Sequence, residues 1–494
     1  MTSQALAKFE NIFTDPDPLG TFVSVVTTNH LLPGTLGAAI RVHIDSEKEQ
    51  LTIPAEEIQS IQLKRGQMDI ASHRDLPTEI LSKIFVCSLA EWGVPIPRSG
   101  IHTPWNLIRV CSLWRQLALN LPELWARVDL RIMRVDSIGP NIRAVQEVIS
   151  ASKNRPLSIR AYFSPLGRSV ARQMIDIIFS DAHRLREISL RGHLSCIEPF
   201  LNLPAGLTES LEIVTLNVPN VIIGVGGTDL SVLKGSAKLR ELTIDIVMLY
   251  SSIFQLPLAQ LTALHLPRSY LHPRAALSIL RQCPSIIQCT LCLSNHGDDA
   301  LPDTTPCLLP ELTHLTLLPW NQGHFDYSRC IELSLVLPRI THFYLKYFYL
   351  DRPWPAPCTQ WITQSGTLQI LHVDIPISSL HIEKLIRASP LLTELSVPRC
   401  TFSASCLEGV ATGALLPKVR KLSCMVDNLD SFYAHLDMLE RRKSDSSHAA
   451  HIAEMMFMTK SSLKESQLGE SARYKEMRSG WKISVMRIMN GAML

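Results

Sequence analysis

The sequence has few charged residues and almost no imbalance between the two signs. Asp, Glu, Lys and Arg make up 19% of its 494 residues, and the net charge is +3. It therefore lacks the basic excess that contacts with nucleic-acid phosphates require. The low charge and the 46% hydrophobic content argue against a mostly disordered chain and favour a continuous buried core. Because 494 residues exceed what one core supports, we expect two or more domains or an array of repeats.

Signals for secretion or membrane insertion are also missing. The first residues lack a basic stretch followed by an apolar core, so no signal peptide is expected. Residues 18–40 contain no Asp, Glu, Lys or Arg, but Asn29, His30 and Pro33 argue against a membrane span there. The 12 cysteines are scattered and form no disulfide framework, which fits a reduced intracellular compartment. We therefore expect a cytoplasmic or nuclear protein, or one found in both, with no membrane partner.

Motifs of enzymes and of metal sites are absent from the sequence. It has no GxSxG and no HExxH. Cys289 and Cys292 form a CxxC pair, but odd spacing on a strand sends them to opposite faces, which does not suit a shared zinc ion. The glycine-rich run at 223–228 lacks the lysine of a phosphate-binding loop. We expect no enzyme activity, catalytic residue, metal or cofactor; an enzyme on this chain would need a cluster of converging polar side chains.

The segment 75–130 has the pattern of three short helices followed by a strand. Leu76-Pro77 precedes the first helix, and Thr78 is its expected cap. Apolar residues recur at helical spacing in two stretches. They are Ile80, Leu81, Ile84, Phe85 and Leu89, and then Leu107, Val110, Cys111, Trp114 and Ala118. Pro122 suits the first turn of a third helix.

The pieces LPxEIxxxIF, VCxxWRxLAL and LPxLW within this segment resemble the F-box-like domain that is abundant in higher fungi. The resemblance implies docking onto a Skp-type adaptor and, through it, onto the cullin of a Skp–cullin–F-box ubiquitin ligase. The adaptor-binding residues that it implies are Leu76, Pro77, Ile80, Ile84 and Trp114. The chain departs from the family's pattern in the long break over 91–104, which carries three prolines.

Two other interpretations of 75–130 stay open. One is a small helical core with no partner. The other is a helix-turn-helix that binds DNA, but the five Lys and Arg of this segment are balanced by five Asp and Glu. A segment with no net charge lacks the basic surface that phosphate contacts need.

Downstream, a motif of the form apolar-x-x-apolar-x-apolar recurs ten times, with a mean period of about 26 residues, as in leucine-rich repeats. The copies begin at Leu185, Leu211, Leu239, Leu261, Ile286, Leu312, Ile340, Leu368, Leu392 and Val419. Each copy predicts a parallel strand and a return segment, stacked into a curved solenoid. Helical apolar spacing predicts return helices within 170–184, 273–283 and 378–389. Regular repeats carry Asn or Cys eight residues after the first apolar residue; only Cys400 fits, so we expect an irregular array.

The predicted fold is therefore α/β, with an irregular leucine-rich-repeat-like solenoid preceded by a small three-helix F-box-like domain. The segment 1–74 is expected to be partly disordered, with a helix over 56–70. The F-box-like domain covers 75–130 and the solenoid covers 131–440. A basic tail, 441–494, carries a candidate last strand.

Strand alternation places the fourth and sixth motif positions in the core and the third, fifth and seventh on the concave face. The fifth-position residues are Ser189, Thr215, Thr243, His265, Thr290, Thr316, Tyr344, His372, Ser396 and Ser423. We expect a target protein to bind this face, with Tyr344, Trp354 and His372 as candidate contacts, because aromatic side chains anchor recognition surfaces. Structural packing of the aromatic residues in 343–361 is the other interpretation.

The sequence thus predicts a substrate-recognition subunit of a Skp–cullin–F-box ubiquitin ligase. Its F-box-like segment would dock to the adaptor, and its solenoid would bind an unknown target protein. The alternative is a non-catalytic repeat scaffold whose vestigial F-box does not bind the adaptor.

Overall fold

The computed structural model divides the chain into two compact units, Met1–Pro199 (unit 1) and Phe200–Leu494 (unit 2). The described residues are 76–89, 93–97, 104–132, 138–164, 168–204, 206–218, 230–246, 253, 255–294, 305–319, 335–346, 366–445, 449–459, 474, 476–477, 481–489 and 492–493. The predicted helix over 56–70 and the candidate contact Trp354 lie outside them.

The described part of unit 1 begins with short helices, in the places where the sequence predicts them. They are α5 (Thr78–Cys87), α6 (Leu107–Val110), α7 (Ser112–Asn120) and the 3-10 turn η1 (Pro122–Leu124). Pro77, and not Thr78, is the N-cap of α5, and its carbonyl accepts the first hydrogen bonds of the helix from the amides of Ile80 and Leu81. No side chain caps this end.

Aromatic side chains hold these helices together. The ring of Phe85, fully buried on α5, lies 4.9 Å from the ring of Trp114 on α7. Trp125 donates from its indole N–H to the carbonyl of Ala118 at 2.8 Å. The ring of Trp105 packs edge-on against Trp125, with 5.3 Å between centroids. The buried indole N–H of Trp125 thus finds a carbonyl acceptor, as burial of this side chain favours.

The break between the first two predicted helices contains a strand. β1 (Val94–Ile96) pairs in parallel with β2 (Arg127–Ile132), so Val94 lies opposite Val128. The indole of Trp105 donates to the carbonyl of Pro95 at 3.0 Å and ties the helices to this strand. The parallel sheet of unit 1 therefore starts inside the segment 75–130.

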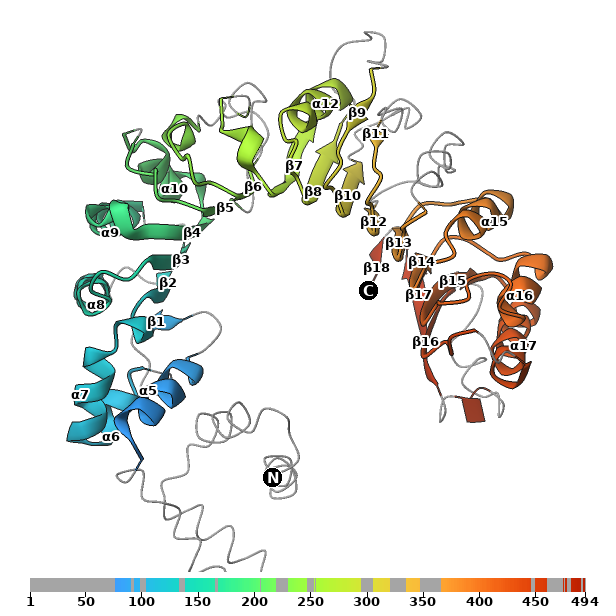
Figure 1. Cartoon of the computed structure of the whole chain (residues 1–494), viewed down its shortest axis with the longest axis horizontal. Helices are drawn as coiled ribbons and strands as arrows, with labels where there is room; N and C mark the ends of the chain where they lie inside the picture. The colour runs from blue at the N-terminus through green and yellow to red at the C-terminus, as the bar shows by residue number, and fades with distance from the viewer. Residues whose placement is uncertain are drawn as a thin grey trace, which may run out of the picture. The chain divides into compact units, whose positions relative to one another are not determined.

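Unit 1 continues with alternating strands and helices. They are α8 (Ile138–Ala151), β3 (Leu157–Phe163), α9 (Arg168–Ser180), η3 (Ala182–Arg184), β4 (Leu185–Gly192) and α10 (Leu194–Leu201), the last of which carries the division between the units. The strands pair in parallel in the order β1-β2-β3-β4. Helices α8 and α9 lie on one face of these strands (Figure 1).

Unit 2 contains a longer run of parallel strands. They are β5 (Ile213–Asn217), β6 (Glu241–Asp245), β7 (Ala263–Leu271), β8 (Gln288–Leu293), β10 (His314–Pro319), β12 (His342–Leu345), β13 (Ile370–Val373), β14 (Glu394–Val397), β15 (Lys421–Val426), β16 (Glu454–Thr459) and β17 (Lys482–Met489). Each pairs in parallel with the next, and β18 (Ala492–Met493) then pairs antiparallel with β17. β9 (Cys307–Leu308) and β11 (Leu335–Val336) form a separate two-stranded sheet.

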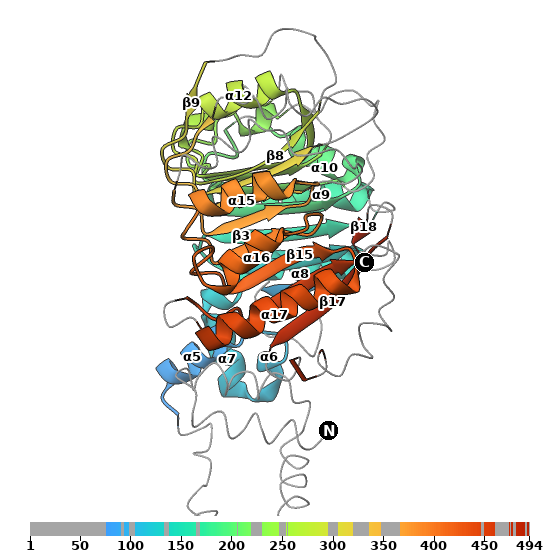
Figure 2. The same cartoon turned by 90° about the vertical axis from the view of Figure 1, so that its right-hand side faces the viewer.

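The return segments of unit 2 contain helices that lie on one face of its strands (Figure 1, Figure 2). They are the turns η4 (Ser231–Leu233) and η5 (Leu258–Gln260) and the helices α12 (Pro273–Arg281), α15 (Ser379–Ala388), α16 (Ala404–Ala411) and α17 (Leu429–Asp445). Ser378 and Ser403 cap α15 and α16 by accepting backbone N–H bonds. The predicted return helices within 170–184, 273–283 and 378–389 are thus observed as α9, α12 and α15.

The ten copies of the motif contribute to the core, one copy in unit 1 and nine in unit 2. The first, fourth and sixth positions of every copy are buried, from Leu185, Ile188 and Leu190 in the first copy to Val419, Leu422 and Cys424 in the last. The α/β class and the parallel pairing are confirmed, and the arrangement is compatible with a solenoid. Burial of these side chains on the helix-covered face is the main stabilising contribution.

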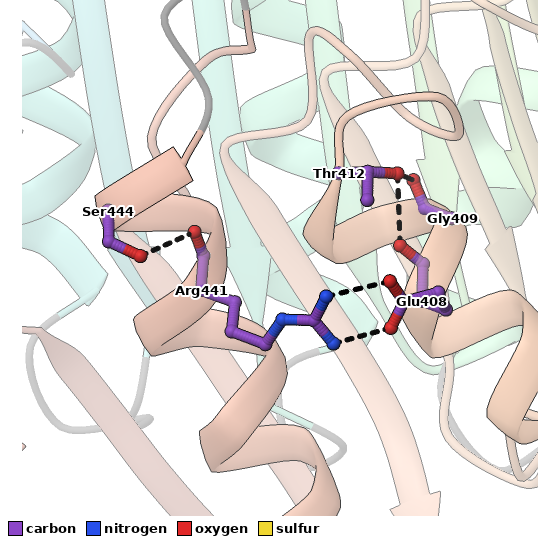
Figure 3. A network of polar contacts seen from close by, with 5 residues as sticks. All are labelled: Glu408, Gly409, Thr412, Arg441 and Ser444. Atoms are coloured by element: carbon purple, nitrogen blue, oxygen red, sulfur yellow. Dashed lines mark hydrogen bonds and ion pairs between the residues drawn. The ribbon is translucent and has the colours of Figure 1, made fainter.

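Helix α17 is fixed to its neighbours by two successive arginines of different kinds. Arg441 forms a two-pronged, solvent-exposed ion pair with Glu408 on α16, with N···O distances of 2.5 and 2.7 Å (Figure 3). The guanidinium of Arg442 is instead buried and donates to the carbonyls of Val410, Leu416 and Ala450 at 2.7–2.9 Å. Burial lowers the pKa of Arg442 to about 10, so it stays charged at neutral pH.

Candidate docking surfaces

Helix α5 carries apolar side chains on its solvent side. Leu81 and Phe85 face the core, whereas Ile80 is 40% exposed and Ile84 is half-buried. Pro77, before the helix, is exposed, and Leu76 is half-buried. Four of the five predicted adaptor-binding residues are thus accessible, which is the arrangement that an apolar docking contact requires.

The neighbouring helices add further exposed apolar residues. Val110 at the end of α6 is 51% exposed and Leu119 on α7 is 46% exposed. The fifth predicted residue, Trp114, is half-buried and lies against Phe85, so part of its surface serves the packing of the helices. Exposed apolar side chains are therefore a repeated feature of the helical part of unit 1.

On unit 2, the fifth-position residues form one continuous line across the sheet. They are register partners from strand to strand in the order Thr215, Thr243, His265, Thr290, Thr316, Tyr344, His372, Ser396 and Ser423. The third-position residues form a parallel line that includes His314, His342, Glu394 and Lys421. Both lines alternate with buried core residues, so they lie on the face opposite the helices.

Tyr344 and His372 lie together in this face. Their ring centroids are 4.8 Å apart in an edge-to-face arrangement, and both side chains are half-buried. Nε2 of His372 lies 2.6 Å from Oε1 of Glu394, and the other carboxylate oxygen of Glu394 lies 3.3 Å from Nζ of Lys421. The ammonium of Lys346 lies 5.5 Å from the Tyr344 ring centroid. The structure thus brings two of the three predicted target contacts into one polar cluster.

The imidazoles of His314 and His342 stack beside this cluster, 3.9 Å apart and nearly parallel. Each Nδ1 lies 2.8 Å from the hydroxyl of the preceding threonine, Thr313 or Thr341. Each hydroxyl donates its proton to a backbone carbonyl, so it can only accept from Nδ1–H. With the hydroxyl proton donated to the carbonyl, each ring is the Nδ1–H tautomer and its Nε2 is an acceptor.

Burial makes these histidines neutral at physiological pH. It lowers the pKa of His314, His342 and His372. For His372 the hydrogen bond and charge of Glu394 oppose this effect without overcoming it. His342 is further held neutral by the neighbouring His314. The face therefore offers imidazole acceptors and a tyrosine hydroxyl, which suit hydrogen bonding to a partner.

The described residues hold no cluster suited to metal binding, since no group of three or more His, Cys, Asp and Glu side chains converges among them. Cys289 and Cys292 are both buried. Burial raises the pKa of Cys292 to about 12 and that of Cys289 further. Such thiols stay protonated, so they are poor nucleophiles and poor ligands. None of the helices that the structure describes combines the length and apolar character of a membrane span.

One polar surface of unit 1 was not predicted from the sequence. Arg131, Tyr162 and Arg191 lie side by side on β2, β3 and β4 of unit 1. Two of these strands precede the first copy of the motif, so the repeat did not point to them. The alternation of Ile159, Ala161 and Phe163 with polar residues was the available signal.

Comparison with known proteins adds no family. The chain matches none of the protein-family models against which it was scanned. A search of curated proteins gives no significant match. The function is therefore inferred from the chemistry of these surfaces and from the motifs in the sequence.

Proposed function

We propose that the chain is the substrate-recognition subunit of a Skp–cullin–F-box ubiquitin ligase. In this proposal the helices α5–α7 are an F-box-like domain and the repeats form an irregular leucine-rich-repeat-like solenoid. The observation that carries the proposal is the exposure of Pro77 and Ile80, with Ile84 half-buried beside them, at the positions where the LPxEIxxxIF motif implies adaptor contacts.

The mechanism would be one of proximity. The adaptor would hold unit 1, and the helix-free face of unit 2 would hold a target protein through Tyr344, His372 and the neighbouring histidines. A target held in this way reaches a ubiquitin-loaded enzyme at a high effective concentration. In this mechanism the chain supplies two docking surfaces and the assembly performs the chemistry.

Adaptor binding by the full chain tests the proposal. We expect a purified Skp-type adaptor to bind the intact protein and to lose binding to a Leu76→Ala/Pro77→Ala/Ile84→Ala variant. Leu308→Ala/Leu380→Ala is the control, because both leucines are highly exposed apolar residues of unit 2. Failure of the folded wild-type chain to bind the adaptor would contradict the proposal.

One observation favours a second candidate, a non-catalytic repeat scaffold. The break between α5 and α6 forms β1, and Val94 and Ile96 on it are fully buried. The helical segment thus has a structural role at the edge of the unit 1 sheet, which it could keep without any adaptor. The same binding experiment separates the two candidates.

A further inference from the structure

Along the strands β2, β3 and β4 of unit 1, buried core residues alternate with residues that point to the other face of the sheet. The register of β2, β3 and β4 arranges nine residues in three rows. The rows are Arg127, Ser158 and Glu187; then Asp129, Arg160 and Ser189; then Arg131, Tyr162 and Arg191. We name these residues the arginine grid. The residues between them on each strand, such as Ile159 and Ala161, are buried.

The grid is positively charged and contains only arginine as its basic residue. It contains four arginines and only two carboxylates, those of Asp129 and Glu187. Asp129 is buried and accepts a 2.9 Å bond from Arg131, so its charge is partly compensated within the grid. Arginine stays charged at any physiological pH and presents a planar set of donors that matches a carboxylate.

In the last row, Arg131 and Arg191 flank Tyr162 on the two neighbouring strands. The Arg191 guanidinium lies 5.7 Å from the centroid of the Tyr162 ring. The Arg131 side chain, on the other side of Tyr162, is 61% exposed. Because neighbouring strands lie about 4.8 Å apart, the backbones of Arg131 and Arg191 are about 10 Å apart. In a polyproline II segment, residues i and i+3 project to the same side about 9 Å apart.

We propose that the arginine grid docks an acidic, extended segment of a partner protein. Two Asp or Glu residues three positions apart would pair with Arg191 and with the guanidinium of Arg131, whose Nε already binds Asp129, and the residues between them would lie beside the Tyr162 ring. The excess of arginine over carboxylate in the grid favours this acidic occupant. The proposal deepens the proposed function. It rests on that function only for the statement that the partner is a target of the ligase; the binding of an acidic segment to the grid does not depend on it.

The test uses the full chain and a fluorescein-labelled peptide of repeated Glu-Pro-Pro units, read by fluorescence anisotropy. We expect binding that weakens about tenfold in Arg131→Gln/Arg191→Gln, since each exposed charge pair contributes modestly. The control is Arg143→Gln/Arg172→Gln, which removes the same charge from exposed positions on α8 and α9 and should leave binding unchanged. Circular dichroism confirms that both variants are folded.

Three outcomes would overturn the proposal. They are no binding of the peptide by the folded wild-type chain, equal weakening by both double variants, and tighter binding of a single-stranded oligonucleotide of the same charge through Arg131 and Arg191. Adaptor binding, measured on the same proteins, should be unaffected by Arg131→Gln/Arg191→Gln. If the chain binds the peptide but not the adaptor, the ligase proposal is contradicted and the proposed peptide binding by the grid still holds.

Discussion

His372 on β13 and Glu394 on β14 share a hydrogen bond of 2.6 Å between Nε2 and Oε1. Burial lowers the pKa of His372 despite this carboxylate, so the bond joins a neutral N–H donor to an anionic acceptor at neutral pH. Glu394 also pairs with Lys421. The candidate target-binding face of unit 2 is therefore less basic than its content of histidine and lysine suggests, and its partner would be recognised mainly by hydrogen bonds and aromatic contact.

Acidification should destabilise the protein through the histidines whose pKa is lowered by burial. Burial lowers the pKa of His265, His314, His342, His372 and His435 from the usual 6.5. The unfolded chain then binds more protons as the pH falls through 6.5 towards the lowered values, so stability is full above pH 6.5 and declines below it. We expect the midpoint temperature of unfolding to fall between pH 7.5 and 5.

A variant isolates one part of that effect. In His314→Gln/His342→Gln the fall in midpoint temperature between pH 7.5 and 5 should be smaller than in the wild type. His193→Gln, at an exposed position, should retain the wild-type fall. Identical pH dependence in all three proteins would show that the stacked pair does not contribute.

The two successive arginines of α17 should differ sharply in their effect on stability. Arg442→Ala removes a buried guanidinium and leaves several buried carbonyls without their donor, which should cost about 3 kcal/mol. Arg441→Ala removes an exposed ion pair and should cost less than about 1 kcal/mol. Urea denaturation of both variants measures the difference, and equal losses would contradict the assigned burial.

Substitutions on helix α5 should distinguish a residue that packs in the core from a residue that is available for docking. Phe85→Ala empties a fully buried site against Trp114 and should destabilise unit 1 by about 3–5 kcal/mol. Ile80→Ala removes a partly exposed side chain and should change stability by no more than about 0.5 kcal/mol. Thermal unfolding provides the comparison. A destabilising Ile80→Ala would place this residue in the core and out of reach of an adaptor.

Gly93 should be required for β1. Its φ is +84°, and a Cβ there would lie 2.5 Å from the carbonyl oxygen of Arg127. Gly93→Ala should therefore weaken the pairing of β1 with β2, through both backbone strain and overlap, by about 1–3 kcal/mol. Gly139→Ala is the control, because a Cβ at Gly139 meets no atom within 4 Å. Faster hydrogen exchange at β1 and β2 in Gly93→Ala alone would confirm this role.

Much of the fold could be predicted from local pattern. The first, fourth and sixth positions of the repeated motif are buried because alternation on a strand sends them to one face, and apolar side chains leave water. The helix after Pro77 and the return helices follow in the same way from apolar spacing. The strand β1 was missed, because a three-residue strand with Pro95 at its centre and Pro97 directly after it carries too little pattern to distinguish a strand from a loop.

The surfaces depend on residues that are distant in the sequence. Their shared fifth position in the motif placed Tyr344 and His372 on one face, but the register of four strands decided that Glu394 and Lys421 join them. The arginine grid arises in the same way from three strands that are about thirty residues apart, so no local window contains grid residues from two of these strands. Local chemistry determines which side chains are buried; the pairing of distant strands determines which exposed side chains meet, because charge and hydrogen-bond partners depend on distance in space.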